Sequence, residues 1–169
     1  MNVALDMGVH ESTEEVQDLK GRYLISLKLI ERLHRLLLDV IKDEFDRMGR
    51  SDVNGVQALL LYNIGDSEVT AGELKSRGYY LGSNVSYNLK KLVESGYIHH
   101  ERSTTDRRSV RVSLTEKGQA VSEVVNNLYD RQLKSLQKVG GIGGEELEGL
   151  NKSLIRLERF WTDQIRYQL

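Results

Sequence analysis

The sequence of 169 residues has no cysteine, no proline, two phenylalanines and one tryptophan. Without cysteine there is no disulfide, no thiolate zinc site and no cysteine redox switch. Without proline, the leucine-rich segments favour long uninterrupted helices. The longest apolar run, Ala58 to Tyr62, is far too short to cross a bilayer, and the N-terminus lacks the basic start and apolar core of a signal peptide. We therefore expect a cytoplasmic protein with no membrane partner.

Acidic and basic residues nearly balance overall but are unevenly distributed. The 24 Lys and Arg against 25 Asp and Glu give a formal net charge of −1. Residues 70–118 hold nine of the basic residues and five of the acidic ones, so this middle carries +4 and the remainder −5. Ordinary fluctuation also accounts for such a pattern. A basic middle in an acidic frame nevertheless indicates a polyanionic partner for one face.

The two ends of the chain carry long apolar stripes at steps of three and four, which is the helix period. The first stripe comprises Leu19, Tyr23, Leu27, Ile30, Leu33, Leu37, Ile41, Phe45 and Met48. The last comprises Leu147, Leu150, Leu154, Leu157, Trp161, Ile165 and Leu169. Both stripes are longer than one small domain between them can cover, so pairing of these helices across a two-fold axis is favoured over an intramolecular bundle. Exposure of such a surface costs about 25 cal/mol per Å².

Three helices are predicted by their starting residues. Asn54 with Gln57 and Thr70 with Glu73 have the spacing of capping boxes, and Thr115 can cap a helix that runs to about Val139. The helix after Asn54 reaches Gly65, and the one after Thr70 is short and ends near Gly78. The glycine-rich segment at 140–144 separates the helix that starts after Thr115 from the last helix of the chain.

The centre of the chain predicts one more helix and then a change of period. From Ser83 to Gly96, one helical face carries Val85, Leu89, Leu92 and Val93, and the other carries Ser83, Asn84, Tyr87, Lys90 and Lys91. Residues 97–103 and 110–114 alternate with period two. The polar turn between them holds Asp106, Arg107 and Arg108. These two runs therefore predict an antiparallel hairpin.

This order predicts a mainly α fold with a small β-hairpin wing: a winged helix-turn-helix with N- and C-terminal dimerisation helices. In such modules the second helix enters the DNA major groove, with its N-terminal residues nearest the bases. Asn84 and Asn88 can bind adenine through two hydrogen bonds, and Ser83 can donate or accept one. Tyr87 can touch a thymine methyl or a phosphate, and phosphates suit Lys90 and Lys91. A merely solvated helix face is the alternative.

The turn of the hairpin carries a second set of candidates. An arginine at the tip of a two-stranded arm can enter a narrow minor groove, where the negative potential is strongest. Either Arg107 or Arg108 suits this role. Asp106 would be repelled by phosphates, so we expect it to cap the turn and stiffen the wing by pairing with Arg108. The alternative is a surface salt bridge worth less than about 1 kcal/mol.

Residues 69–118 resemble the MarR family of bacterial winged helix-turn-helix regulators. The resemblance is carried by Glu73-Leu74, by Val85, Leu89, Leu92 and Gly96, by Asp106-Arg107-Arg108, and by Leu114-Thr115 with Gly118. It implies a homodimer on a pseudo-palindromic operator in double-stranded DNA, more often a repressor, and often one whose DNA binding a small effector weakens. In the family, effectors often bind where the dimer helices meet the winged domain, which here implies Leu33, Leu37, Leu59 and Tyr62. Each of these is equally well explained as core.

The expected organisation has four parts. Residues 1–18 form an N-terminal arm, 19–50 the first part of the dimerisation region, 51–118 the winged helix-turn-helix, and 119–169 the second part of the dimerisation region.

Other functions find less support in the sequence. A winged-helix protein-interaction module without specific DNA binding would use the same face. For an enzyme we find no nucleophile elbow, zinc-hydrolase spacing or dinucleotide fingerprint, so we expect no catalysis and no cofactor. The glycines at 140–144 follow a helix and lack the Gly-Lys-Ser/Thr ending of a phosphate loop. The four histidines, His10, His34, His99 and His100, lead us to assign no metal, although Glu31 and His34 lie one helical turn apart.

Overall fold

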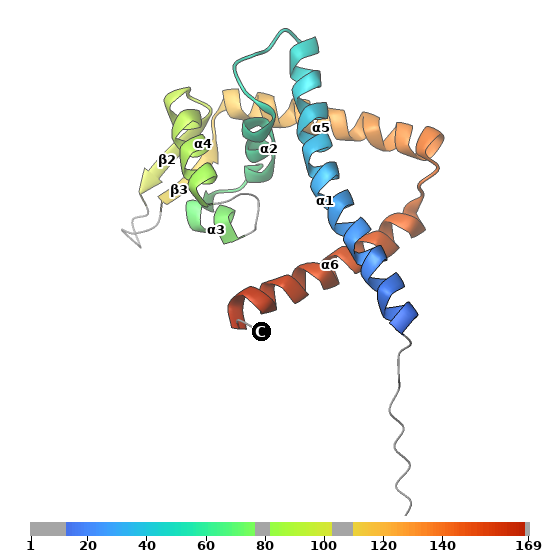
Figure 1. The fold of residues 1–169 in the computed structure, drawn as a ribbon. Helices are drawn as coiled ribbons and strands as arrows, with labels where there is room; N and C mark the ends of the chain where they lie inside the picture. The colour runs from blue at the N-terminus through green and yellow to red at the C-terminus, as the bar shows by residue number, and fades with distance from the viewer. Residues whose placement is uncertain (1–12, 77–81, 103–109, 168–169) are drawn as a thin grey trace, which may run out of the picture.

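The computed structural model describes residues 13–76, 82–102 and 110–167. In these ranges the elements follow one another as α1 (Thr13–Arg47), α2 (Gly55–Ile64), β1 (Val69–Thr70), α3 (Ala71–Ser76), α4 (Gly82–Glu94), β2 (Ile98–Arg102), β3 (Val110–Leu114), α5 (Glu116–Ser135), a π-helical turn η1 (Leu136–Gly140) and α6 (Gly144–Tyr167). The predicted mainly α fold with a small β wing is confirmed (Figure 1). Helix α1 begins at Thr13, six residues before the predicted apolar stripe.

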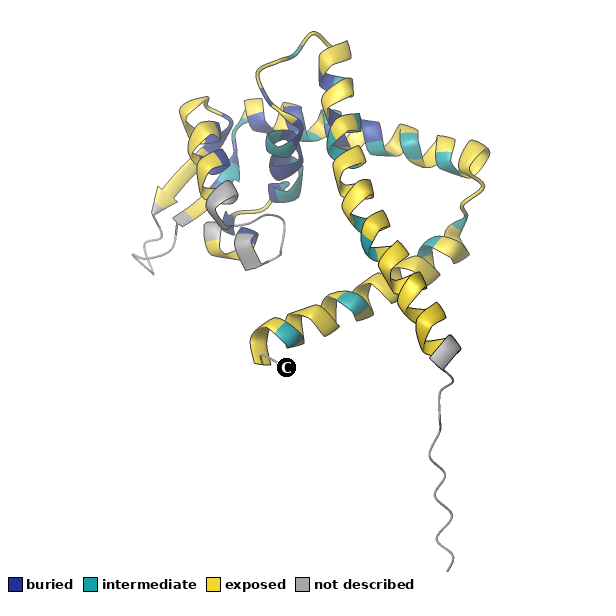
Figure 2. Cartoon of the chain, in the orientation of Figure 1, coloured by how far each residue is buried: buried dark blue, intermediate teal, exposed yellow. Residues whose placement is uncertain are grey.

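Helix α2 forms the centre of the hydrophobic core. Ala58, Leu60 and Leu61 are fully buried, and Ile64 is 2% exposed. A helix that is apolar on all sides must be covered on all sides, and α2 packs against α1, α5 and β3. The buried residues accordingly gather around α2 and the part of α5 beside it, whereas most of α1 and all of α6 are exposed or half-buried (Figure 2). The core therefore belongs to the winged part of the subunit.

The sheet has three strands in the order β1-β3-β2, and every neighbour is antiparallel. The predicted hairpin is confirmed, with Ile98 opposite Leu114 and His100 opposite Val112. Strand β1 was not predicted, because two residues are too short to show a period of two. Val69 of this strand lies opposite Val112 and is buried. The wing is thereby joined to the segment that leads into α3.

The predicted helix starts are confirmed in detail. The Asn54 side chain accepts a hydrogen bond from the Gln57 amide, and the Gln57 side chain accepts one from the Asn54 amide. Thr70 and Glu73 make the same reciprocal pair, at 3.0 and 2.6 Å. The Thr115 hydroxyl accepts a hydrogen bond from the Gly118 amide at 3.2 Å. These bonds satisfy amides that the first turn of a helix leaves without partners.

Tyr97 joins the end of α4, the sheet and the start of α5. Its amide donates to the Leu92 carbonyl, and its own carbonyl accepts a hydrogen bond from the Thr115 amide at 3.1 Å. A Cβ atom on Gly118 would lie 2.1 Å from that carbonyl oxygen, so only glycine permits this approach of α5 to the strand. The Lys117 ammonium lies 4.1 Å from the centre of the Tyr97 ring and donates to the Ser95 carbonyl. This contact places a cation at the C-terminal end of α4, where a helix dipole favours it.

The Tyr97 hydroxyl donates to the carboxylate of Asp52, in the loop between α1 and α2. Arg50 forms an ion pair with the same carboxylate at 3.3 Å. The Tyr97 hydrogen bond, followed by that from Arg50, lowers the pKa of Asp52 from 3.8 to about 2. Burial, together with the neighbouring carboxylate, raises the pKa of Tyr97. The loop that follows the first long helix is thus fastened to the junction between α4 and the wing.

The long helices α1, α5 and α6 extend away from the core. Helix α5 runs outward from the winged part, the chain turns after η1, and α6 returns across α1 (Figure 1). The Trp161 indole donates to the Tyr23 hydroxyl at 3.3 Å where these two helices meet. Among the described residues of α6, none is buried. No helix in the described part of the chain is long and apolar enough to span a membrane.

The Asp52 contacts predict an acid-sensitive fold. A carboxyl whose pKa is lowered by folding contributes stability above its unfolded pKa, and this contribution is lost as the pH falls through the folded value. We expect the free energy of unfolding, measured by urea denaturation, to fall between about pH 4 and pH 2, and Asp52→Asn to flatten this dependence. Tyr97→Phe should cost about 1 kcal/mol at neutral pH. Asp130→Asn, an exposed carboxylate on α5, is the control; equal slopes for all variants would refute the role of Asp52.

Candidate nucleic-acid interface

Helix α4 is held to the core by one face and leaves the other in solvent. Leu89 and Leu92 are 7% and 1% exposed, and α4 packs against α3 and β2. Tyr87 is 62% exposed, and Lys90 and Lys91 are also exposed. The predicted separation of apolar and polar residues on this helix is therefore confirmed for these positions. Its solvent face presents one aromatic ring and two ammonium groups.

Asn88 does not lie on the exposed face, contrary to the prediction that it contacts a base. The residue is only 9% exposed. The reason is its helical position: residues four apart share one side of a helix, and Asn88 is four residues before the buried Leu92. Asn88 is therefore largely covered by the rest of the chain.

Several candidate residues fall outside what the structure describes. Asp106, Arg107 and Arg108 lie in the range 103–109, outside the described residues. The backbone of Ser83 and Asn84 is in the first turn of α4, but their side chains are likewise outside the description. Their roles in contacting DNA and in stiffening the wing stay predictions.

The two lysines of α4 share one carboxylate. The Lys91 ammonium lies 3.4 Å from a carboxylate oxygen of Glu94, and the Lys90 ammonium lies 3.9 Å from the other. Glu94 is the last residue of α4. Half of its side-chain surface is accessible, at 48%, as is that of Lys91. The positive charge of the exposed face is therefore partly neutralised by a neighbour on the same helix.

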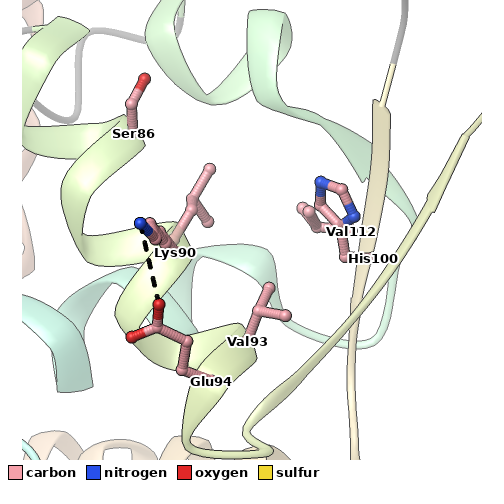
Figure 3. A pocket seen from close by; sticks show the side chains of 7 residues that line it. Ser86, Lys90, Val93, Glu94, His100 and Val112 are labelled. Atoms are coloured by element: carbon pink, nitrogen blue, oxygen red, sulfur yellow. Dashed lines mark ion pairs between the residues drawn. The ribbon is translucent and has the colours of Figure 1, made fainter.

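A cleft of about 440 Å³ separates α4 from the sheet. Figure 3 shows Ser86, Lys90, Val93 and Glu94 of α4 on one side and His100 of β2 with Val112 of β3 on the other. Its walls are mainly apolar, and its charged groups, Lys90 and Glu94, come from α4. The sequence analysis did not assign Ser86, Glu94 or His100 to a site. The signal was present, because Ser86, Lys90 and Val93 are spaced by four and three residues.

A second polar cluster lies on the sheet. Arg111 of β3 forms an ion pair with Glu68 at 3.1 Å and lies opposite Glu101 of β2. His99 and Ser113 line the same shallow depression of about 140 Å³. His99 and His100 are on different surfaces of the sheet, as expected from their adjacent positions in a strand. Within the described ranges, no three His, Asp or Glu side chains are grouped so that they can hold a metal ion.

The four residues assigned to an effector cleft differ in burial, and their role in binding an effector stays a prediction. Leu59 belongs to the hydrophobic core, and Leu37 and Tyr62 pack against that core. The Tyr62 ring meets Tyr129 of α5 edge to face, with 5.1 Å between ring centres. Leu33 is 58% exposed on α1. A groove of about 720 Å³ instead runs between α1 and α5, and an ion pair between Arg131 and Glu44 crosses it.

Comparison with known proteins identifies the module that carries α4. Residues 53–118 match the family model of a winged helix DNA-binding domain. The chain is 34% identical, over 148 residues, to the exopolysaccharide II synthesis transcriptional activator ExpG of Rhizobium meliloti, and the match covers 86% of this chain and 74% of that protein.

Solved structures show the same fold at lower identity. A mutant of MarR from E. coli complexed with operator DNA is 21% identical, with a TM-score of 0.62, over 77% of this chain and 91% of that one. FabT of Streptococcus pneumoniae in complex with DNA is 23% identical, with a TM-score of 0.60, over 84% of this chain and 98% of that one. At these identities the likeness concerns the fold alone.

Proposed function

The chain belongs to the MarR family of winged helix-turn-helix transcriptional regulators, and we propose that it binds a pseudo-palindromic operator in double-stranded DNA as a homodimer. It is a DNA-binding regulator of transcription. The observation that carries the proposal is the exposed face of α4, where Tyr87, Lys90 and Lys91 project beside the sheet. We assign it no catalytic step, and we place its activity in the cytoplasm.

In the proposed complex, α4 enters the major groove and the wing reaches the neighbouring minor groove. Ser83 and Asn84 are in the first turn of α4, which is the part of a recognition helix that approaches base edges. Lys90 and Lys91 follow one to two turns later and suit phosphates, which fix register without reading sequence. Arg107 or Arg108 at the wing tip suits a narrow minor groove.

The homodimer is supported by apolar surface that the single subunit leaves in water. Large apolar residues at least 36% exposed lie along both end helices. They are Val16, Leu19, Tyr23, Leu24, Ile25, Leu29, Leu33 and Leu36 of α1, and Leu150, Leu154, Ile155, Phe160, Trp161, Ile165 and Tyr167 of α6. Surfaces of this extent mark interfaces. A two-fold axis through these helices sets two copies of α4 about one DNA turn apart, near 34 Å.

Repression follows if the operator overlaps the site of polymerase, because the bound dimer occupies the promoter. Activation is the second candidate, favoured by one observation: the relative with 34% identity is named a transcriptional activator. The same DNA-bound dimer can repress or activate, since the direction of the effect on transcription depends on where the operator lies relative to the promoter. Measuring transcription from templates with the operator moved relative to the promoter separates the two.

We further propose that a small effector weakens DNA binding. An effector acts only through different affinities for two states of the dimer. A state in which the two α4 helices no longer match the operator spacing provides that difference. The groove between α1 and α5, lined in part by Val40, Leu128 and Leu136, lies among the helices that set this spacing.

Substitutions on α4 test the assignment of residues. Lys91→Ala should weaken binding to all duplexes and reduce the slope of log K against log salt by about 1, because one phosphate contact is lost. Asn84→Ala should instead relax preference at particular bases, at about 1–3 kcal/mol per lost bidentate contact. Fluorescence anisotropy with protected genomic fragments and random duplexes measures both. Unchanged affinity for both variants would mean that α4 does not face DNA.

A charge in the apolar stripe of α6 tests the dimer. Leu150 is 52% exposed in the subunit, so Leu150→Glu should leave the subunit folded. Burial of an unpaired carboxylate at an interface is costly, so the variant should become monomeric in sedimentation velocity and lose most operator affinity. Asn151→Glu is the matched control, because it adds the same charge at the next, exposed position of α6. A Leu150→Glu protein that stays dimeric would exclude this stripe from the interface.

A further inference from the structure

We propose that Glu94 is a built-in competitor for DNA phosphate, which limits the sequence-independent affinity of the recognition helix. The inference rests on the proposed function of α4 and adds to it a residue that opposes binding. Glu94 is the only acidic residue between Gly82 and Gly96. Its two carboxylate oxygens are shared between Lys90 and Lys91, at 3.9 and 3.4 Å. Those are the two cations of this helix assigned to phosphates.

Helix stability does not account for a carboxylate at this position. Glu94 is the last residue of α4, where the negative end of the helix dipole favours cations and disfavours anions. The pair with Lys90 also has the lysine on the N-terminal side, which is the weaker order of an i,i+4 pair. Both ion pairs are solvent-exposed, with the Lys90 side chain 76% accessible, and exposed pairs stabilise a fold little.

In the proposed complex, by contrast, this carboxylate affects how strongly the two lysines bind DNA phosphates. A phosphate that approaches Lys90 or Lys91 has to displace Glu94 or share the ammonium with it. Glu94 also lines the cleft between α4 and the sheet, opposite His100 (Figure 3). In the proposed complex this cleft lies between the element in the major groove and the wing in the minor groove, so the DNA backbone passes near it. The distances from Glu94 to both lysines are well below the Debye length of about 10 Å at 0.1 M salt.

The consequence is a reduced phosphate-driven affinity on every sequence. Contacts to phosphate supply essentially all of non-specific binding. With Glu94 in place, the two lysines contribute less than two full positive charges to non-specific binding of DNA phosphates. A regulator that must leave non-specific DNA quickly gains from such a limit, because the genome offers a vast excess of competing sites.

The test compares Glu94→Gln with the native protein on a labelled random-sequence duplex, titrated by anisotropy across about 50 to 200 mM salt. The variant keeps the size and hydrogen-bonding ability of the side chain and removes the charge. We expect affinity to rise about five- to tenfold near 0.1 M salt, and the slope of log K against log salt to steepen by up to about 1, as for one additional phosphate contact. Unchanged or weaker binding by a variant with native circular dichroism and thermal unfolding would overturn the inference.

Three further proteins make the result specific. Glu148→Gln removes a carboxylate that pairs with Lys152 at 2.6 Å on α6, a helix that contributes no described residue to the cleft beside α4, and should leave DNA affinity unchanged. Glu94→Asp retains the charge and should stay close to native. In a Lys90→Gln/Lys91→Gln background, Glu94→Gln should give little gain; a full gain there would show that Glu94 repels DNA without competing for the lysines.

The outcome also separates this inference from the proposed function. If Lys91→Ala weakens binding while Glu94→Gln has no effect, α4 faces DNA and only the competitor role is wrong. If neither lysine variant nor Glu94→Gln changes the affinity, the assignment of α4 to the DNA interface is itself wrong.

Discussion

The close approach of α5 to Tyr97 is the constraint on which the rest of the winged part depends. Tyr97 lies three residues after the end of α4, and its carbonyl accepts a hydrogen bond from the amide of Thr115, the first residue after β3. Because Gly118 carries no side chain, the next helix can begin against this strand. The Tyr97 hydroxyl then reaches back to Asp52, beyond the end of α1. One residue thus connects the loop after α1, the end of α4, the wing and the start of α5.

The elements themselves were largely predictable, because local signals define them. Reciprocal capping pairs mark the starts of α2 and α3, and Thr115 marks that of α5. The hairpin followed from a period of two between residues 97 and 114. What the sequence could not show is long-range: the two-residue strand β1, which exists only because β3 pairs with it, and the bond between Tyr97 and Asp52, which lie 45 positions apart.

The residues of the candidate interface can likewise be divided into those that the sequence predicted and those that it did not. The exposed Tyr87, Lys90 and Lys91 were found from helical periodicity alone, and the winged-helix match covers them. Asn88 was assigned to DNA from its residue type, yet it is only 9% exposed, because it lies four residues before a buried leucine. His100 was missed since it meets α4 only when the sheet packs beside that helix, whereas the helical spacing of Ser86 with Lys90 and Val93 was available in the sequence. The pairing of Glu94 with Lys90 and Lys91 was also available in the sequence, because residues three and four apart are neighbours on a helix.

Strand β1 has a mechanical consequence. Because β3 lies between β1 and β2, the wing shares its central strand with the residues that lead into α3. The wing and the start of α3 are therefore held together by backbone hydrogen bonds, and a movement of one against the other would require breaking them. A tilt of the winged part as a whole on the long helices breaks none of these bonds.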